Sequence, residues 1–173
     1  MWLPGPNLLL ALPRVGAAGE KVARFVALVR VLVVLLAVLL VLGVVVTGAG
    51  PHSGDDEVGY RFDVDPWLMA KMHAASVWAF IAVLVAILVL LRRSGVRGRP
   101  WTAALVLLAV TLGQGLVGYV QLFTGLPVAL VNLHMLGAAL LATAVTFYVG
   151  TTRSRGPAGS PSAAPAQSVA AQQ

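Results

Sequence analysis

The chain has 173 residues, of which 59% are hydrophobic and only 10% are charged, whereas a soluble domain carries about a quarter of its residues as charges to cover its surface. The net charge of +6 does not indicate nucleic-acid binding, because the basic residues lie between apolar runs, where they orient helices. Cysteine is absent, which excludes disulfides, zinc–thiolate sites, iron–sulfur clusters and covalent attachment of a haem through paired cysteines.

Residues 1–24 contain several basic residues and three prolines, and we expect them to form a cytoplasmic N-terminal segment. Four apolar runs follow, each near the roughly 20 residues that a hydrocarbon layer of about 30 Å requires. They are residues 25–47, 67–91, 101–123 and 128–150. Because a lipid-exposed backbone must satisfy its own hydrogen bonds, each run is predicted to be a helix. The predicted fold is an all-α integral membrane protein with a four-transmembrane-helix bundle over residues 25–150.

The connecting segments differ in charge. The first loop, about residues 48–66, holds five of the six acidic residues, whereas the second, residues 92–100, holds four arginines. Ten of the twelve basic residues fall on the side of the second loop, and only Arg61 and Lys71 fall on the other side. Since basic loops stay in the cytoplasm, both termini are predicted to be cytoplasmic and the first loop extracytoplasmic. Residues 151–173, rich in Ser, Pro, Ala and Gln, are predicted to be a disordered cytoplasmic tail.

Two of the three histidines lie inside the predicted spans, where an ionisable side chain is costly and indicates function. His73 follows Pro66 by seven residues, and His134 follows Pro127 by seven residues. Both helices run inward from the same side, so at about 1.5 Å per residue both imidazoles lie about 10 Å below the helix starts. Two histidines at equal height on parallel helices of a bundle are typical of ligands that hold one haem iron from both faces. We therefore predict His73 and His134 as the axial ligands of a haem.

Other polar residues are candidates to support this site. Gln114 and Gln121 share one face of the third helix, which is expected to point into the bundle, where they could hydrogen-bond a ligand. Arg61 is a candidate partner for a haem propionate. Ser76 and Gly137 each lie three residues after a histidine, where a small side chain is expected to leave room for a flat macrocycle.

Two alternatives concern the histidines themselves. They could pack against neighbouring helices without binding a metal, as a single intramembrane histidine often does. A zinc or copper site is disfavoured, because the sequence offers no third ligand at the same depth. His52, in the first loop, is predicted to be a loop residue and not a ligand.

Several segments resemble the second half of bacterial heme A synthases. They are Val45–Asp55, Lys71–Ala74, Gln114–Gln121, Phe123–Pro127 and Leu130–Met135. The resemblance covers about residues 25–150, with the motifs in the family's order. It implies a membrane enzyme of eight helices that oxidises the methyl group of haem O to the formyl group of haem A, for cytochrome oxidase assembly. It also implies that His73 and His134 hold a b-type haem cofactor, while the family's first half binds haem O as substrate.

The chain departs from the family pattern in three respects. Four helices are predicted instead of eight, and the cysteine pairs of many members are absent. Gly48 aligns with the glutamate thought to act in catalysis, so no catalytic residue is assigned. The chain therefore resembles the half of the family that transfers electrons. Three alternatives remain for the chain itself: a fragment of a longer protein, one subunit of a split enzyme, or a half that associates with itself.

The leading functional hypothesis is a heme A synthase-type oxidoreductase of the bacterial plasma membrane, or its C-terminal half that binds b-type haem. The alternatives are a stand-alone bis-histidine b-type cytochrome that carries electrons, and a non-catalytic membrane assembly subunit. The expected partners are the lipid bilayer, haem, a missing N-terminal half, a second copy of the chain and haem O synthase. Nucleic acid is not expected.

Overall fold

The computed structural model describes residues 17–50 and 62–152, and all regular structure in these residues is α-helical. The four helices are α1 (Ala17–Ala49), α2 (Pro66–Arg93), α3 (Arg99–Phe123) and α4 (Val128–Thr152). Each of these four helices is long and apolar enough to cross a membrane, so the described residues confirm the four predicted helices.

The first helix is longer than its apolar run. It begins at Ala17, whereas the sequence predicts a start near Phe25, so the end of the expected N-terminal segment is helical. An ion pair one turn apart, between Arg24 and Glu20, supports these additional turns. Bilayer thickness sets the length of the apolar run and not the length of the helix, and this is why composition alone predicts too late a start.

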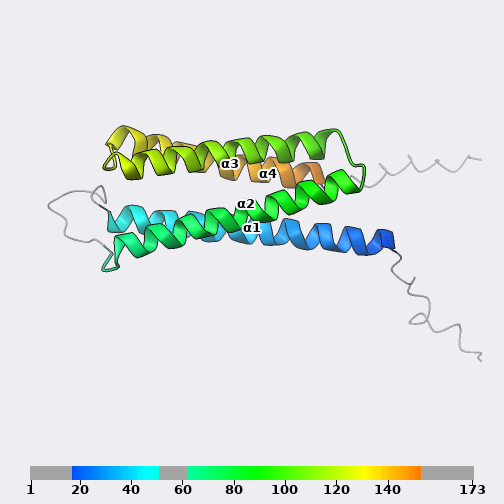
Figure 1. Ribbon diagram of the computed structural model, residues 1–173, viewed down its shortest axis with the longest axis horizontal. Helices are drawn as coiled ribbons and strands as arrows, with labels where there is room; N and C mark the ends of the chain where they lie inside the picture. The colour runs from blue at the N-terminus through cyan, green and yellow to red at the C-terminus, as the bar shows by residue number, and fades with distance from the viewer. Residues whose placement is uncertain (1–16, 51–61, 153–173) are drawn as a thin grey trace, which may run out of the picture.

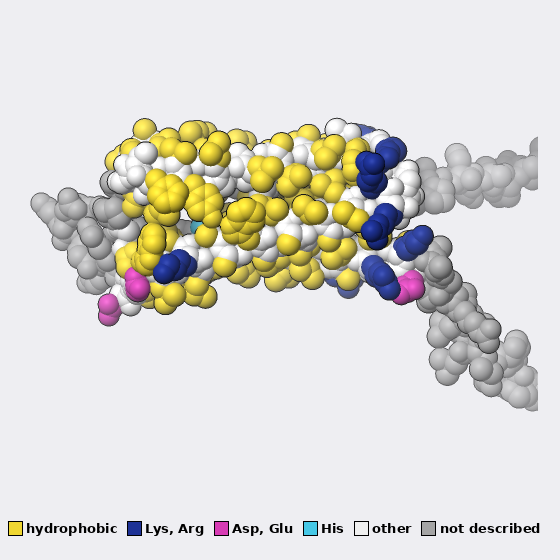
Figure 2. Space-filling view, in the orientation of Figure 1, with side chains coloured by type: hydrophobic (Ala, Val, Ile, Leu, Met, Phe, Trp, Pro, Cys, Tyr) yellow, Lys and Arg dark blue, Asp and Glu magenta, His cyan; other side chains and the backbone are white. Residues whose placement is uncertain are grey.

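The helices form two antiparallel hairpins, α1–α2 and α3–α4, which lie one above the other in Figure 1. We call the end at which α1 and α3 finish and α2 and α4 begin the histidine end. The opposite end, where the short connection 94–98 joins the two hairpins, is the arginine end, and Lys and Arg side chains gather there in Figure 2. The two hairpins are thus joined by the described chain at the arginine end only.

Local signals fix where α2 and α4 begin. The Asp65 side chain accepts a hydrogen bond from the Trp67 amide at 2.9 Å and caps α2, and Pro66 occupies the first helical turn, where its missing N–H costs nothing. The tight turn before α4 places Gly125 and Leu126 at positive φ angles of 79° and 59°. Both α2 and α4 therefore start at the histidine end and run in the same direction.

Burial is concentrated in the half of the bundle nearer the arginine end. Side chains from all four helices form one core there, in which Phe80, Leu84, Leu107 and Tyr148 are fully enclosed. In the other half, which we call the histidine half (residues 40–50, 62–79 and 112–140), the only buried residues among those described are Ala49 and Ser76. The bundle is tightly packed at one end and loosely packed at the end that carries the histidines.

Apolar side chains cover the outer surface along the length of the bundle (Figure 2). Val41, Leu116 and Phe147, for example, each expose 60% or more of their surface. A soluble monomer rarely exposes a continuous apolar surface of this extent. The four apolar helices and this surface together suggest a multi-pass membrane protein.

Candidate functional site

The imidazole rings of His73 and His134 face each other across the histidine half. Their centroids lie 6.4 Å apart and their planes cross at 81°. One ring comes from α2 and the other from α4, so each hairpin contributes one histidine. The structure brings the two histidines together at the same height, as their equal spacing from Pro66 and Pro127 predicts. That they ligate iron stays a prediction.

The ring of His73 is held by the neighbouring helix of its own hairpin. Its Nδ1 atom lies 2.9 Å from the carbonyl oxygen of Leu39 in α1. Because a carbonyl can only accept, this bond places the ring proton on Nδ1 and leaves Nε2 as the free, basic nitrogen. A metal-binding histidine is commonly oriented in this way, by a bond from its second nitrogen to a backbone carbonyl. Ser76 does not contribute to the ring's setting, since its hydroxyl donates to the His73 carbonyl at 2.7 Å.

The second histidine is positioned through its backbone. The Gln114 side chain donates from Nε2 to the carbonyl oxygen of His134 at 2.8 Å and so ties α3 to α4. The Nδ1 atom of His134 is buried and has no hydrogen-bond partner in the described residues. A hydrogen bond therefore holds the backbone of His134, and none holds its ring.

Two glycines make room for the rings. A Cβ atom on Gly43 of α1 would lie 3.3 Å from Cε1 of His73, and one on Gly118 of α3 would lie 3.1 Å from Cε1 of His134. These distances are shorter than ordinary contacts, so a side chain at either position would press on the imidazole. The glycines lie on the two helices that carry no histidine. Each hairpin thus pairs one histidine with one facing glycine.

These features fit a metal shared by the two imidazoles. Two metal–nitrogen bonds of about 2 Å each and two ring radii of about 1 Å each give a separation of about 6 Å between ring centroids, close to the 6.4 Å observed. The free Nε2 of His73 agrees with a metal ligand, and the two glycines give the imidazole rings the room to lie between the helices. Among the described residues no group of three or more His, Cys, Asp or Glu side chains could hold a metal ion.

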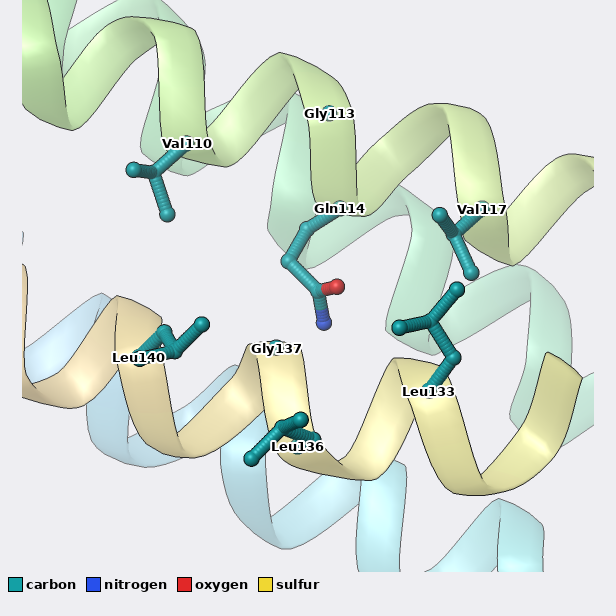
Figure 3. Close-up of a pocket in the computed structure, with 8 residues that line it drawn as sticks. All are labelled: Val110, Gly113, Gln114, Val117, Leu133, Leu136, Gly137 and Leu140. Atoms are coloured by element: carbon teal, nitrogen blue, oxygen red, sulfur yellow. The ribbon is translucent and has the colours of Figure 1, made fainter. Parts of the chain in front are cut away.

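The two predicted glutamines have different surroundings. Gln114 does not point to the histidine rings: its amide extends from α3 toward Gly137 of α4, at the floor of a shallow groove of about 270 Å³ (Figure 3). A Cβ at position 137 would overlap that amide, so the space beside Gly137 is filled by Gln114 and is not open to a macrocycle. The Gln121 carbonyl oxygen Oε1 is buried without a partner in the described residues, and its role as a ligand contact stays a prediction.

Three other positions named from the sequence are Arg61, His52 and Gly48. Arg61 and His52 lie outside the described residues. Gly48, at which the resemblance predicts a glutamate position, lies near the end of α1. The Phe62 ring covers it, and a Cβ at position 48 would overlap that ring. The Phe62 amide also donates to the Gly48 carbonyl at 3.3 Å. An aromatic side chain, and not a carboxylate, therefore occupies the space next to this glycine.

The partners of the two histidines carry little sequence signal. The carbonyl of Leu39 belongs to the backbone and carries no sequence signal, whereas Gly43 and Gly118 could have been found as glycines at the histidines' depth on the neighbouring helices. Comparison of the chain with protein-family models, with curated proteins and with solved structures gives no match.

Proposed function

We propose that this chain is a bis-histidine haem protein of the bacterial plasma membrane, and that it is the electron-transferring half of a heme A synthase-type oxidoreductase. The observation that supports this proposal is the 6.4 Å separation between the centroids of His73 and His134, which fits two imidazoles on one iron. The segments that resemble heme A synthases support the choice of oxidoreductase. In this proposal the arginine end lies in the cytoplasm.

The chain's own residues would bind and tune the iron. His73 would bind through Nε2, because its Nδ1 donates to the Leu39 carbonyl, and that bond raises the basicity of the ligand nitrogen. His134 would be the second ligand, with the Gln114 amide fixing the height of its helix. The bound haem would supply one-electron transfer between ferric and ferrous iron. The apolar side chains of the histidine half would exclude water from the iron. Because water stabilises charge, the charge on the iron would be stabilised less there.

The resemblance implies oxidation of haem O to haem A, and in this proposal the oxidising site belongs to a second four-helix half. Gly48 stands where the family has its glutamate, and Asp65, one of two described carboxylates at the histidine end, is engaged in capping α2. The second half could be a separate protein or another copy of this chain. Haem O synthase is the expected source of substrate.

A reduced-minus-oxidised absorption spectrum of the protein purified in detergent tests haem binding. We expect a bis-histidine b-type signal from the wild type and from His52→Ala, and no signal from His73→Ala or His134→Ala. Helical content by circular dichroism controls for folding of the variants. A wild type without the signal, or equal signals from all three variants, would overturn the assignment.

A second experiment separates the oxidoreductase from a stand-alone electron carrier. Membranes that make haem O would be supplied with this chain, alone and together with a first half from a heme A synthase, and the extracted haems would be separated by chromatography. Haem A that appears only with both halves, and is lost with His73→Ala, supports the proposal. Bound haem without any conversion favours the carrier.

A further inference from the structure

The two hairpins are connected firmly at one end only. The chain joins them through residues 94–98 at the arginine end, and the core that all four helices share lies in the adjacent half. In the histidine half the packing is loose, and part of a histidine side chain is visible in the seam between the hairpins in Figure 2. This arrangement allows the hairpins to separate at the histidine end while the core at the other end stays packed.

One hydrogen bond crosses the seam in that loosely packed half. The indole Nε1 of Trp78 in α2 donates to the hydroxyl oxygen of Tyr119 in α3 at 3.2 Å. Among the described residues, it is the one side-chain hydrogen bond that joins the two hairpins, because the bonds of His73 and Gln114 stay within their own hairpins. Tyr119 in turn stacks on Phe123, with ring centroids 6.2 Å apart.

Tyr119 adjoins a residue that contacts a histidine, and Trp78 lies about 7.5 Å further along α2 than His73. Tyr119 follows Gly118, the residue that faces the His134 ring, and Trp78 lies five residues beyond His73 along α2. Trp78 exposes 58% of its surface and Tyr119 41%, so both rings lie on the outer face of the bundle. Aromatic rings with one polar atom are suited to this position, because their faces tolerate lipid while the polar atoms satisfy each other.

We propose that the α2–α3 seam is the side through which a planar porphyrin enters the histidine site from the lipid, and that Trp78 and Tyr119 are the residues that close over it. The inference rests on the proposed function, which supplies the ligand. Because His73 and His134 sit on different hairpins, separating the hairpins at this seam also separates the two ligands. A flat apolar ring can then slide between them without unfolding a helix. When the seam closes, the Trp78–Tyr119 bond re-forms.

Variants that lack the hydrogen bond but keep a ring test the role of the pair. Trp78→Phe and Tyr119→Phe are compared with Trp67→Phe, which removes another exposed indole of α2 that does not bond to the second hairpin. The measurement is the rate at which haem leaves the purified holoprotein for excess apomyoglobin. Loss of one typical hydrogen bond corresponds to about a 2- to 10-fold faster release. We expect this from the first two variants and not from Trp67→Phe.

Cross-linking tests the route itself, and the absence of cysteine makes the labelling specific. A Trp78→Cys/Tyr119→Cys variant is bridged with a bis-maleimide before haem is added, and a Val117→Cys/Leu133→Cys variant, whose side chains face each other within the second hairpin (Figure 3), is the control. Bridging the seam should slow haem uptake at least 10-fold, and bridging within the hairpin should not.

The possible results are distinct. A wild type without a bis-histidine spectrum overturns the proposed function and this inference together. A normal wild-type spectrum, with equal uptake in the two bridged variants and equal release from the three phenylalanine variants, overturns the entrance alone. Slower haem uptake in both bridged variants also overturns the proposed entrance, because a general stiffening of the bundle would then explain the result.

Discussion

The Nδ1 atom of His73 lies 2.9 Å from the carbonyl oxygen of Leu39, so α1 orients a ring that α2 carries. His134 has no such bond to its ring, and the Gln114 amide instead holds the backbone of its helix. One hairpin therefore fixes the orientation of its histidine, and the other fixes only the height. Substitutions in the two hairpins should affect different properties of the site.

Gly118→Ala should weaken haem binding. The new methyl group would lie 3.1 Å from Cε1 of His134, whose ring is not anchored by a hydrogen bond and would turn away. Overpacking by one methyl group costs about 1–3 kcal/mol, which corresponds to a loss of affinity of roughly 5- to 160-fold. Haem titration followed by absorbance measures this. Gly115→Ala is the control, since a Cβ there meets no atom within 4 Å, and equal affinities of the two variants would contradict the prediction.

Gly137→Ala should destabilise the protein even without haem. Its Cβ would overlap the Gln114 amide and displace the donor that binds the His134 carbonyl. We expect a loss of about 1–3 kcal/mol in the free energy of unfolding, measured in detergent. If this overlap is the cause, combining Gly137→Ala with Gln114→Ala should restore part of the lost stability, because the two positions are in contact. A double variant whose losses simply add would show that another effect is responsible.

Asp65→Ala should remove the cap of α2, since the Asp65 carboxylate accepts the Trp67 N–H at 2.9 Å. The expected cost is about 1 kcal/mol of unfolding free energy, and Asp65→Asn should retain most of the stability. Asp63→Ala serves as the matched control, because Asp63 has no part in the α2 cap. The prediction fails if the two alanine variants unfold at the same denaturant concentration.

Tyr148→Phe should make the protein more stable. The Tyr148 side chain is fully enclosed, and its hydroxyl has no hydrogen-bond partner in the described residues. Leaving such a group unsatisfied costs about 1–3 kcal/mol, and phenylalanine removes it without opening a cavity. Thermal unfolding would reveal the gain. Tyr119→Phe should show no gain, because its hydroxyl accepts a bond from Trp78, and a lower stability of Tyr148→Phe would indicate an unrecognised partner.

The spans and the height of the histidines could be predicted from the sequence, because both follow from simple counting. The length of an apolar run identifies a span, and equal offsets from Pro66 and Pro127 place His73 and His134 at one level. The start of α1 could not be predicted in this way, because helical turns beyond the apolar run are stabilised by local pairs such as Glu20–Arg24.

The contacts around the histidines were harder to predict. Helical periodicity gives the face of a residue on its own helix, but the neighbour it meets depends on how the helices are rotated. Periodicity thus indicates that Gln114 points into the bundle, but not that it packs on Gly137 and bonds to the His134 backbone. The carbonyl of Leu39 belongs to the backbone, so no pattern of side chains in the sequence indicates it as the partner of His73.

The placement of one histidine on each hairpin has a consequence for biosynthesis. The chain is made from its N-terminus, so α1 and α2 are inserted first, and His73 is present with its Leu39 contact before α4 has been synthesised. A ligand that needs both imidazoles cannot be captured at that stage. Under the proposed function, such a ligand would bind only after the insertion of α4, because a chain that ended after α2 would carry one of the two histidines.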